Sequence, residues 1–182
     1  MRAAEPDHYS SLQKTLHWLI ATLIVVMIAV GLTMRNIGQG PVTNFLYELH
    51  KSTGLTILGL ALLRTVVRLR RGAPPLEPGI PPMQRLAAYA SHYGLYALVL
   101  LTPVVGWTAT SACCAPVNFF WTVPVTLPVS GEEAWWKAVF RIHFVLAFSL
   151  AALALLHASA ALHHHFVRRD RTLRRMLPER RA

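Results

Sequence analysis

The feature that most constrains this chain is a run of 19 residues, Leu16 to Met34, without a single charged side chain. About 20 apolar residues in an α-helix cross the hydrocarbon core of a bilayer, whereas a water-soluble helix needs a polar face. Three more long apolar segments follow, and only 14% of all residues are charged, against about 25% in soluble domains. The sequence therefore predicts an all-α integral membrane protein, a four-helix bundle with helices at about 16–34, 44–70, 84–112 and 138–167.

The segments between these helices carry residues that end helices. Gly38, Gly40 and Pro41 follow the first helix, and five prolines lie between residues 72 and 82. A Pro- and Trp-bearing loop over 113–133 separates the last two helices. We expect a single transmembrane domain over 1–182, in which 168–182 form a basic cytoplasmic tail.

The positions of the basic residues predict how the bundle is oriented. Cytoplasmic flanks of membrane helices carry an excess of Lys and Arg. Of the 18 lysines and arginines, 14 fall on the side of the two termini and four on the other side. Both termini are therefore expected to face the cytoplasm. The net charge of +10 does not indicate nucleic-acid binding, because the basic residues flank membrane helices instead of forming a separate patch.

Five histidines fall within or at the ends of the expected helices, and ionisable residues there are candidates for a function. Each one alone is equally well explained as an interfacial or packing histidine. Their spacing is more informative than their number. The five are His17, His50, His92, His143 and His157.

The fourth helix carries two of these histidines on one face. His143 and His157 are 14 residues apart, which gives an angular offset of about 40° and an axial separation of about 21 Å. One helix could thus give an axial ligand to each of two stacked haems. Matching depth pairs His50 with His143 at the outer side and His17 with His157 at the inner side, while His92 remains a geometric competitor for the inner site.

Arg64 lies 14 residues after His50 and so on a similar face of the second helix, at the inner level. A buried arginine there could pair with haem propionates. The alternative is a topogenic arginine that extends its side chain to the membrane interface.

Three segments of the chain resemble the bacterial cytochrome b561 family. They are YSSLQKTLHW at 9–18, LHKSTG at 49–54, and His157 followed by LHHHF at 162–166. The resemblance implies a bacterial inner-membrane protein whose four helices hold two b-type haems through His17, His50, His143 and His157. It is nearest to the small stand-alone diheme type, which includes a superoxide oxidase that passes electrons to ubiquinone.

A histidine cluster lies at the inner end of the fourth helix, near the expected depth of a quinone headgroup. Quinone reduction needs protons, and histidine titrates near neutrality. One of these histidines, with Lys14 nearby, could bind a ubiquinone carbonyl, and the family resemblance favours His163 or His164 over His165. The alternative is a basic tail that binds anionic lipid.

The leading hypothesis is a diheme b-type cytochrome, an oxidoreductase that moves electrons between an outer donor and ubiquinone. Superoxide is the donor to test, although four outer cations face three outer glutamates and so give only a weak positive field. A second hypothesis is a haem-binding membrane-anchor subunit of a larger dehydrogenase or hydrogenase. A third is a structural membrane protein without haem, which predicts a colourless preparation.

Overall fold

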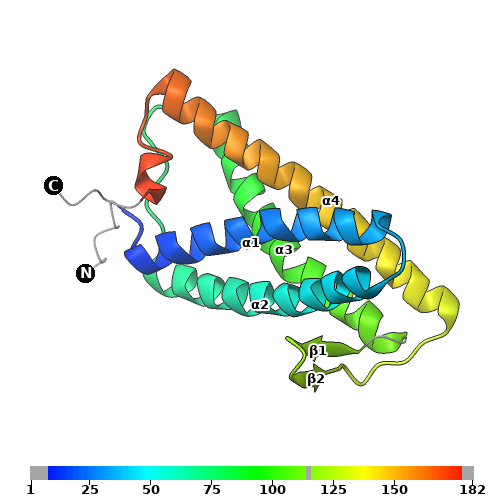
Figure 1. Ribbon diagram of the computed structural model, residues 1–182. Coiled ribbons are helices and arrows are strands. Elements are labelled where there is room, and N and C mark those ends of the chain that lie inside the picture. The colour runs from blue at the N-terminus through cyan, green and yellow to red at the C-terminus, as the bar shows by residue number, and fades with distance from the viewer. Residues whose placement is uncertain (1–7, 114–115, 178–182) are drawn as a thin grey trace.

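The computed structural model describes residues 8–113 and 116–177. Its main elements are four long helices: α1 (Ser11–Asn36), α2 (Pro41–Arg71), α3 (Pro82–Ala112) and α4 (Glu133–His163). Each of them is long and apolar enough to cross a membrane, which confirms the predicted all-α membrane bundle. The helices alternate in direction, so that successive connections lie at opposite ends (Figure 1).

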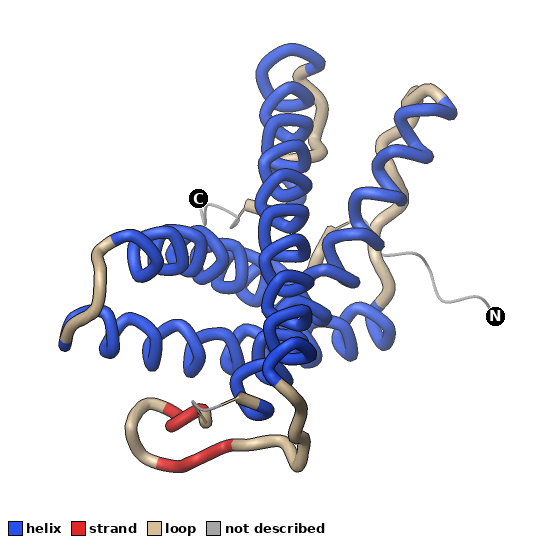
Figure 2. The backbone as a smooth tube through the Cα atoms, turned by 90° about the vertical axis from the view of Figure 1, so that its right-hand side faces the viewer, coloured by secondary structure: helices blue, strands red, loops and turns tan. Residues whose placement is uncertain are grey.

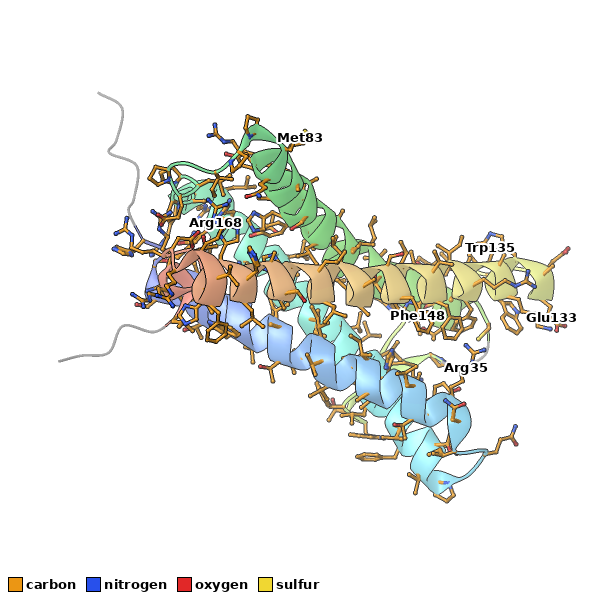
Figure 3. The ribbon with its side chains drawn as sticks, turned by 90° about the horizontal axis from the view of Figure 1, so that it is seen from above. Arg35, Met83, Glu133, Trp135, Phe148 and Arg168 are labelled. Atoms are coloured by element: carbon orange, nitrogen blue, oxygen red, sulfur yellow. The ribbon has the colours of Figure 1, made fainter. Side chains whose placement is uncertain are left out.

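The helices pack in sequence order. α2 packs against α1 and α3, and α3 packs against α4. Met83 and Arg168 mark one end of the bundle, and Arg35, Trp135 and Glu133 lie toward the other (Figure 3). The first end, where α1 begins and α4 ends, is called the terminal end, and the second, which carries two short strands, is called the hairpin end.

All four helices begin before the ranges that hydropathy predicts, and α1 and α2 also end after them. α1 starts at Ser11 because Ser10 caps it: the Ser10 hydroxyl accepts from the Gln13 backbone N–H, and the Gln13 side chain accepts from the Ser10 N–H at 2.9 Å. Proline stands at the first position of α2, and Gly72, with φ of 70°, ends that helix. Hydropathy marks the part of a helix that crosses hydrocarbon, whereas these capping residues fix its ends.

Large apolar side chains cover the outside of the bundle. Val145, Phe148, Leu155 and Leu156 on α4 are all exposed, the last two by about two thirds. Such a surface would be unstable in water but is stable against lipid chains. The lipid-facing surface therefore agrees with the four membrane spans.

A β-hairpin lies at the hairpin end, within the segment expected to be an irregular loop. Strands β1 (Val117–Phe119) and β2 (Val123–Val125) pair antiparallel and lie outside the group of helices (Figure 2). Ser52 on α2 anchors it, since its hydroxyl accepts from the Phe120 N–H at 2.8 Å and donates to the Asn118 carbonyl at 3.3 Å. The side chain of Ser52 is fully buried.

The segment after α4 folds back onto the terminal end. A π-helix (His164–Arg168) continues α4, and a 3-10 turn (Arg174–Met176) follows. Trp18 donates its indole N–H to the Met176 carbonyl at 2.7 Å, and Arg175 donates to the Pro75 carbonyl at 2.6 Å. The predicted basic tail over 168–182 is thus packed against the bundle up to residue 177, and its remaining residues lie outside the described part.

Candidate functional site

Histidines from three helices come together in pairs at two levels of the bundle. At the hairpin end, the ring centroids of His50 on α2 and His143 on α4 are 6.3 Å apart, and the ring planes differ by 81°. At the terminal end, the centroids of His17 on α1 and His157 on α4 are also 6.3 Å apart, with an angle of 77°. The two pairs have the members that the sequence predicts.

His92 on α3 lies at the terminal level as well. Its ring centroid is 5.3 Å from that of His157. Spacing alone left it as a competitor of His17 for the inner site, whereas the family resemblance favoured His17. The two candidates differ in their distance from His157, and that distance decides which pair leaves room for a metal ion.

The separation of the pairs fits two imidazoles on opposite sides of one metal ion. An imidazole nitrogen binds a transition metal at about 2.0 Å and lies about 1.1 Å from the ring centre, so the two centroids stand about 6.2 Å apart. Both predicted pairs match this separation, whereas His92 and His157 are too close by about 1 Å. Among the described residues no group of three or more His, Cys, Asp or Glu side chains could hold a metal ion, so the remaining ligands would have to come from a cofactor such as haem.

Both pairs also join helices whose backbones do not pack closely. Each pair takes one histidine from α4, and the other histidine is on α1 or α2. Within the described ranges, the backbone of α4 packs extensively against α3 but not against α1 or α2. A planar cofactor needs such a separation, because it must enter between the two rings. The helix arrangement therefore fits a group held between α4 and the pair formed by α1 and α2.

A hydrogen bond and a glycine orient the ring of His143. Its Nδ1–H donates to the Thr102 carbonyl on α3 at 2.9 Å, which leaves Nε2 unprotonated and able to bind a metal. A Cβ added at Gly106, one turn after Thr102, would lie 2.9 Å from two atoms of this ring. Gly106 thus leaves the space that the ring fills.

The ring of His50 is held by packing. A Cβ added at Gly31 on α1 would lie 3.3 Å from its Cε1 atom and 3.7 Å from Nδ1. Nδ1 is buried and has no hydrogen-bond partner among the described residues. The edge that faces Gly31 therefore contains Cε1 and Nδ1, and Nε2 lies farther from Gly31 than either atom.

Arg64 lies beside the terminal pair. It donates to the Gln13 carbonyl at 2.7 Å, and its guanidinium carbon is 5.9 Å from the centre of the Tyr96 ring. It is also within electrostatic range of His17 and His157. The cation therefore lies between the first turn of α1 and the terminal histidine pair, and its remaining N–H groups could reach an anionic group placed between the two histidines.

Within the predicted quinone cluster, His164 is the histidine that a carboxylate holds. Its Nδ1 lies 2.5 Å from Oδ2 of Asp170, whose other oxygen accepts from the Thr172 N–H at 2.9 Å. Arg169, with φ of 56°, turns the chain back so that Asp170 reaches His164. Burial alone would raise the pKa of Asp170, but the hydrogen bonds from His164 and Thr172 outweigh it and keep this pKa below its ordinary value.

The other two predicted quinone residues lie differently. His163 is exposed, whereas Lys14 is buried, with 7% of its surface exposed. Lys14 lines a pocket of about 240 Å³ together with four other basic residues, and neither His163 nor His164 is part of that lining. The structure thus does not bring Lys14 into one pocket with the histidine cluster.

A comparison with known families fits this arrangement. The model of the family described as prokaryotic cytochrome b561 matches residues 8–179, nearly the whole chain. The chain belongs to the prokaryotic cytochrome b561 family. As a member of it, the protein is a multi-pass bacterial membrane cytochrome that binds b-type haem and takes part in electron transport.

Three relatives of this cytochrome b561 are similar over nearly their full length. Cytochrome b561 homolog 2 of Escherichia coli K12 is 35% identical, over 94% of this chain and 92% of the relative. Probable superoxide oxidase CybB of Yersinia pestis is 30% identical, over 96% and 98%. Cytochrome b562 of Cereibacter sphaeroides is 34% identical, over 94% and 96%.

Sequence reasoning missed three residues of this cytochrome b561 that support the histidines. Thr102 acts through its backbone carbonyl, which no side-chain pattern reveals. Gly106 could have been noticed, because a glycine inside a membrane helix often marks a close approach. Asp170 could also have been noticed, as an acid with an arginine on either side in the basic segment that follows α4.

Proposed function

We propose that this protein is a diheme cytochrome in which His50 with His143, and His17 with His157, are the axial ligands. The observation that carries the proposal is that both pairs have centroids 6.3 Å apart, the separation that two axial imidazoles require. Two b-type haems bound at these pairs would supply one-electron redox chemistry at two depths of the membrane. Two histidine ligands leave no open position for oxygen, which favours electron transfer.

Arg64 is proposed to bind the propionates of the inner haem. Its position beside His17 and His157 supports this role over that of a topogenic arginine. A guanidinium offers several N–H donors in a fixed plane and binds carboxylates in a bidentate manner. The same cation would favour the reduced state at this level, since reduction adds negative charge.

We further propose that the terminal end faces the cytoplasm and that the protein lies in the inner membrane. The support is the distribution of basic residues, of which 14 out of 18 are on the side of the termini. The basic segment after α4 packs against this end, and the hairpin then faces the outer side. This orientation places the pair of His50 and His143 nearer the outer surface.

Ubiquinone is the proposed electron acceptor, with His164 as the residue that binds and protonates its carbonyl oxygen. Quinone takes up two electrons and two protons on reduction to quinol. His164 is supported over His163 because Asp170 holds its ring through the contact of Nδ1 with Oδ2. The burial of Lys14 in a separate basic pocket gives that residue less support as a quinone ligand.

Superoxide is the proposed donor at the outer side. Two superoxide ions would release two electrons and leave as two molecules of oxygen, which balances the reduction of one quinone. One support is the relative named probable superoxide oxidase CybB. Another is a pocket of about 670 Å³ at the hairpin end, lined in part by Arg35, which also stacks on Phe144, the neighbour of His143.

The test is a reduced-minus-oxidised spectrum of the purified protein, with haem quantified per chain, before and after addition of a superoxide source and a ubiquinone analogue. Two haems reduced by superoxide and reoxidised by the quinone are expected. His50→Ala and His17→Ala should each lose one haem. Two haems that do not respond to superoxide would favour the alternative, a membrane-anchor subunit of a larger dehydrogenase or hydrogenase, and a protein without haem would contradict the proposal.

A further inference from the structure

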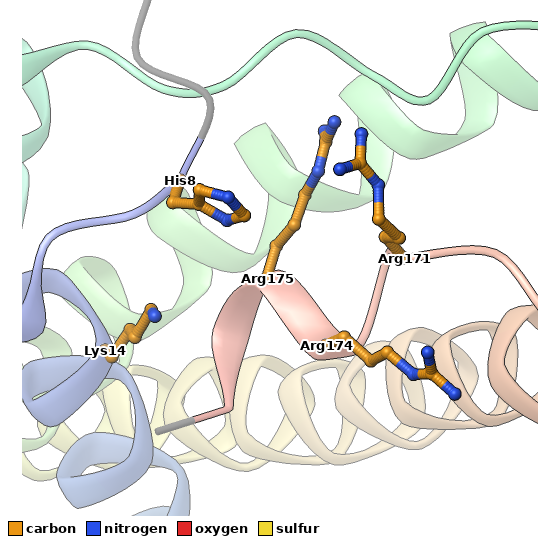
Figure 4. A pocket seen from close by; sticks show the side chains of 5 residues that line it. All are labelled: His8, Lys14, Arg171, Arg174 and Arg175. Atoms are coloured by element: carbon orange, nitrogen blue, oxygen red, sulfur yellow. The ribbon is translucent and has the colours of Figure 1, made fainter. Parts of the chain in front are cut away.

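The connection between α3 and α4 contains no charged residue. The terminal end of the bundle carries a pocket lined by basic side chains (Figure 4), whereas residues 113–131 at the hairpin end include no Asp, Glu, Lys or Arg. Connections that lie in water are built mainly from polar residues. The composition of this connection is closer to that of a membrane span, and the hairpin lies in the middle of it.

The hairpin points back along the helices instead of away from them. Strand β1 packs against α2 and α3 (Figure 1). At the end of β2, the Val125 carbonyl accepts from the Trp107 indole N–H at 3.0 Å. Two residues later, the Leu127 N–H donates at 3.1 Å to Ser111, one helical turn nearer the end of α3. The chain therefore runs along β2 toward the end of α3, and the turn at 120–122 lies on the membrane side of β2.

The turn lies at the edge of the hydrocarbon-spanning part of α2. The Phe120 N–H donates to the hydroxyl of Ser52. Ser52 is the first residue of the stretch 52–63, which has no charged side chain, and Lys51 before it is the last charged residue at this end of α2. Charged side chains mark where a helix leaves the hydrocarbon. The turn is therefore expected at the boundary between lipid headgroups and acyl chains.

The backbone of the turn is suited to an apolar environment. All three of its N–H groups have acceptors: that of Phe120 donates to Ser52 at 2.8 Å, and those of Trp121 and Thr122 donate at 3.0 Å to carbonyls of β1. An unpaired N–H group is costly in lipid, where no water can bind it. The positive φ angles of the turn, 43° and 61°, belong to Phe120 and Trp121, whereas hairpin turns usually have glycine or asparagine there.

The side chains at the turn form an exposed apolar patch. Phe120, Trp121 and Val123 are each between 39% and 56% exposed. Trp121 stacks on Phe45 of α2, with ring centroids 5.0 Å apart and planes that differ by 15°, and Phe45 is itself half exposed. The patch is thus continuous with the exposed apolar surface of α2. Tryptophan at such a position is typical of a membrane interface.

We propose that the hairpin is a re-entrant element whose turn inserts into the membrane leaflet at the hairpin end and binds lipid at the boundary between headgroups and chains. Three observations favour lipid over a partner protein. The patch continues the apolar surface of α2, it lies at the depth of that boundary, and the N–H groups of the turn need no further partner. The inference depends neither on the haem sites nor on the orientation of the protein in the membrane.

The experiment measures how fast single introduced cysteines react with a water-soluble, membrane-impermeant maleimide. The purified full-length protein is placed in vesicles of phosphatidylcholine and phosphatidylglycerol, and peptide mass spectrometry identifies the modified site, so that native cysteines do not contribute. Val123→Cys and Gln39→Cys both replace exposed side chains at the hairpin end. Val123→Cys should react about tenfold more slowly or less, because the reactive thiolate is disfavoured in an apolar medium.

Two further positions and a second reagent serve as controls. Ser130→Cys, exposed in the same connection after β2, should react as fast as Gln39→Cys, whereas Val25→Cys, exposed in the middle of α1, should react slowly. A lipid-soluble maleimide should modify both Val25→Cys and Val123→Cys. Equal rates for Val123→Cys and Gln39→Cys with the water-soluble reagent would overturn the proposal. It would also be overturned if neither reagent modified Val123→Cys, because a protein surface would then cover the hairpin.

Discussion

Replacement of Gly106 by alanine tests the position of the His143 ring directly. The new Cβ would lie 2.9 Å from both Cε1 and Nδ1 of that ring, whereas ordinary contacts begin at 3.4 Å. The ring must therefore move by about 0.5 Å, more than the roughly 0.2 Å within which metal–ligand distances are held. The hydrogen bond to the Thr102 carbonyl opposes this movement.

The expected cost is that of an overpacked core, about 1–3 kcal/mol, which corresponds to a loss of roughly fivefold to 150-fold in haem affinity at the outer site. Alanine is otherwise the better helix former by about 1 kcal/mol, so α3 itself should not be weakened. We expect the Gly106→Ala protein to contain about one haem per chain instead of two, measured by pyridine haemochrome assay and protein quantification.

Two other glycines provide matched comparisons. Gly31→Ala brings a Cβ to 3.3 Å from Cε1 of His50, so it should keep both haems and change only the spectrum of the outer one. Gly59→Ala, in α2, meets nothing within 4 Å and should behave like the unmodified protein. If Gly106→Ala retains two haems with unchanged spectra, then His143 does not bind a haem in the position described, and the reasoning is refuted.

Three other predictions concern groups around the two sites. Arg64→Gln should lower the midpoint potential of the inner haem by an amount on the order of 50 mV, where 59 mV equals about 1.4 kcal/mol for one electron. A redox titration measures this shift, and an equal shift of both haems would contradict the role of Arg64 at the inner haem. Because the pKa of Asp170 is lowered in the folded protein, the ionised carboxylate stabilises the segment after α4. This stabilisation is fully present at pH values above the ordinary pKa of about 3.9, and it is lost as the pH falls through the lowered pKa. The protection factors of residues 164–176 in hydrogen exchange, relative to the unfolded chain at the same pH, should therefore fall in acid, and Asp170→Asn should show the low protection already at neutral pH. Ser52→Ala leaves the Phe120 N–H without its partner and should destabilise the hairpin by about 1–3 kcal/mol, seen as faster proteolysis there while haem content stays unchanged.

The four helices and the histidine pairs could be predicted because both depend on local patterns. A charge-free run such as 16–34 marks a membrane span without knowledge of its neighbours. The 14-residue spacing of His143 and His157 fixes their common face through helix geometry alone. Spacing alone could not choose between His17 and His92, because that choice depends on distances between rings of different helices; the family resemblance favoured His17, and the ring distances agree with it.

The hairpin and the packed terminal segment could not be predicted in this way. Ser52 and Phe120 are 68 residues apart, and Trp18 and Met176 are 158 apart, so no local pattern links them. The turn of the hairpin also contains Phe120 and Trp121 with positive φ angles, where glycine or asparagine would have been expected. The packing of Lys14 into a basic pocket likewise depends on the return of the chain after α4.

The position of α4 has a consequence for biogenesis. Each histidine pair takes one member from α4, which is the last long helix to leave the ribosome. A nascent chain with three inserted helices thus holds only one half of each pair. Under the proposed ligation, a chain that stops before α4 would lack one ligand of each pair and should not load haem at either level.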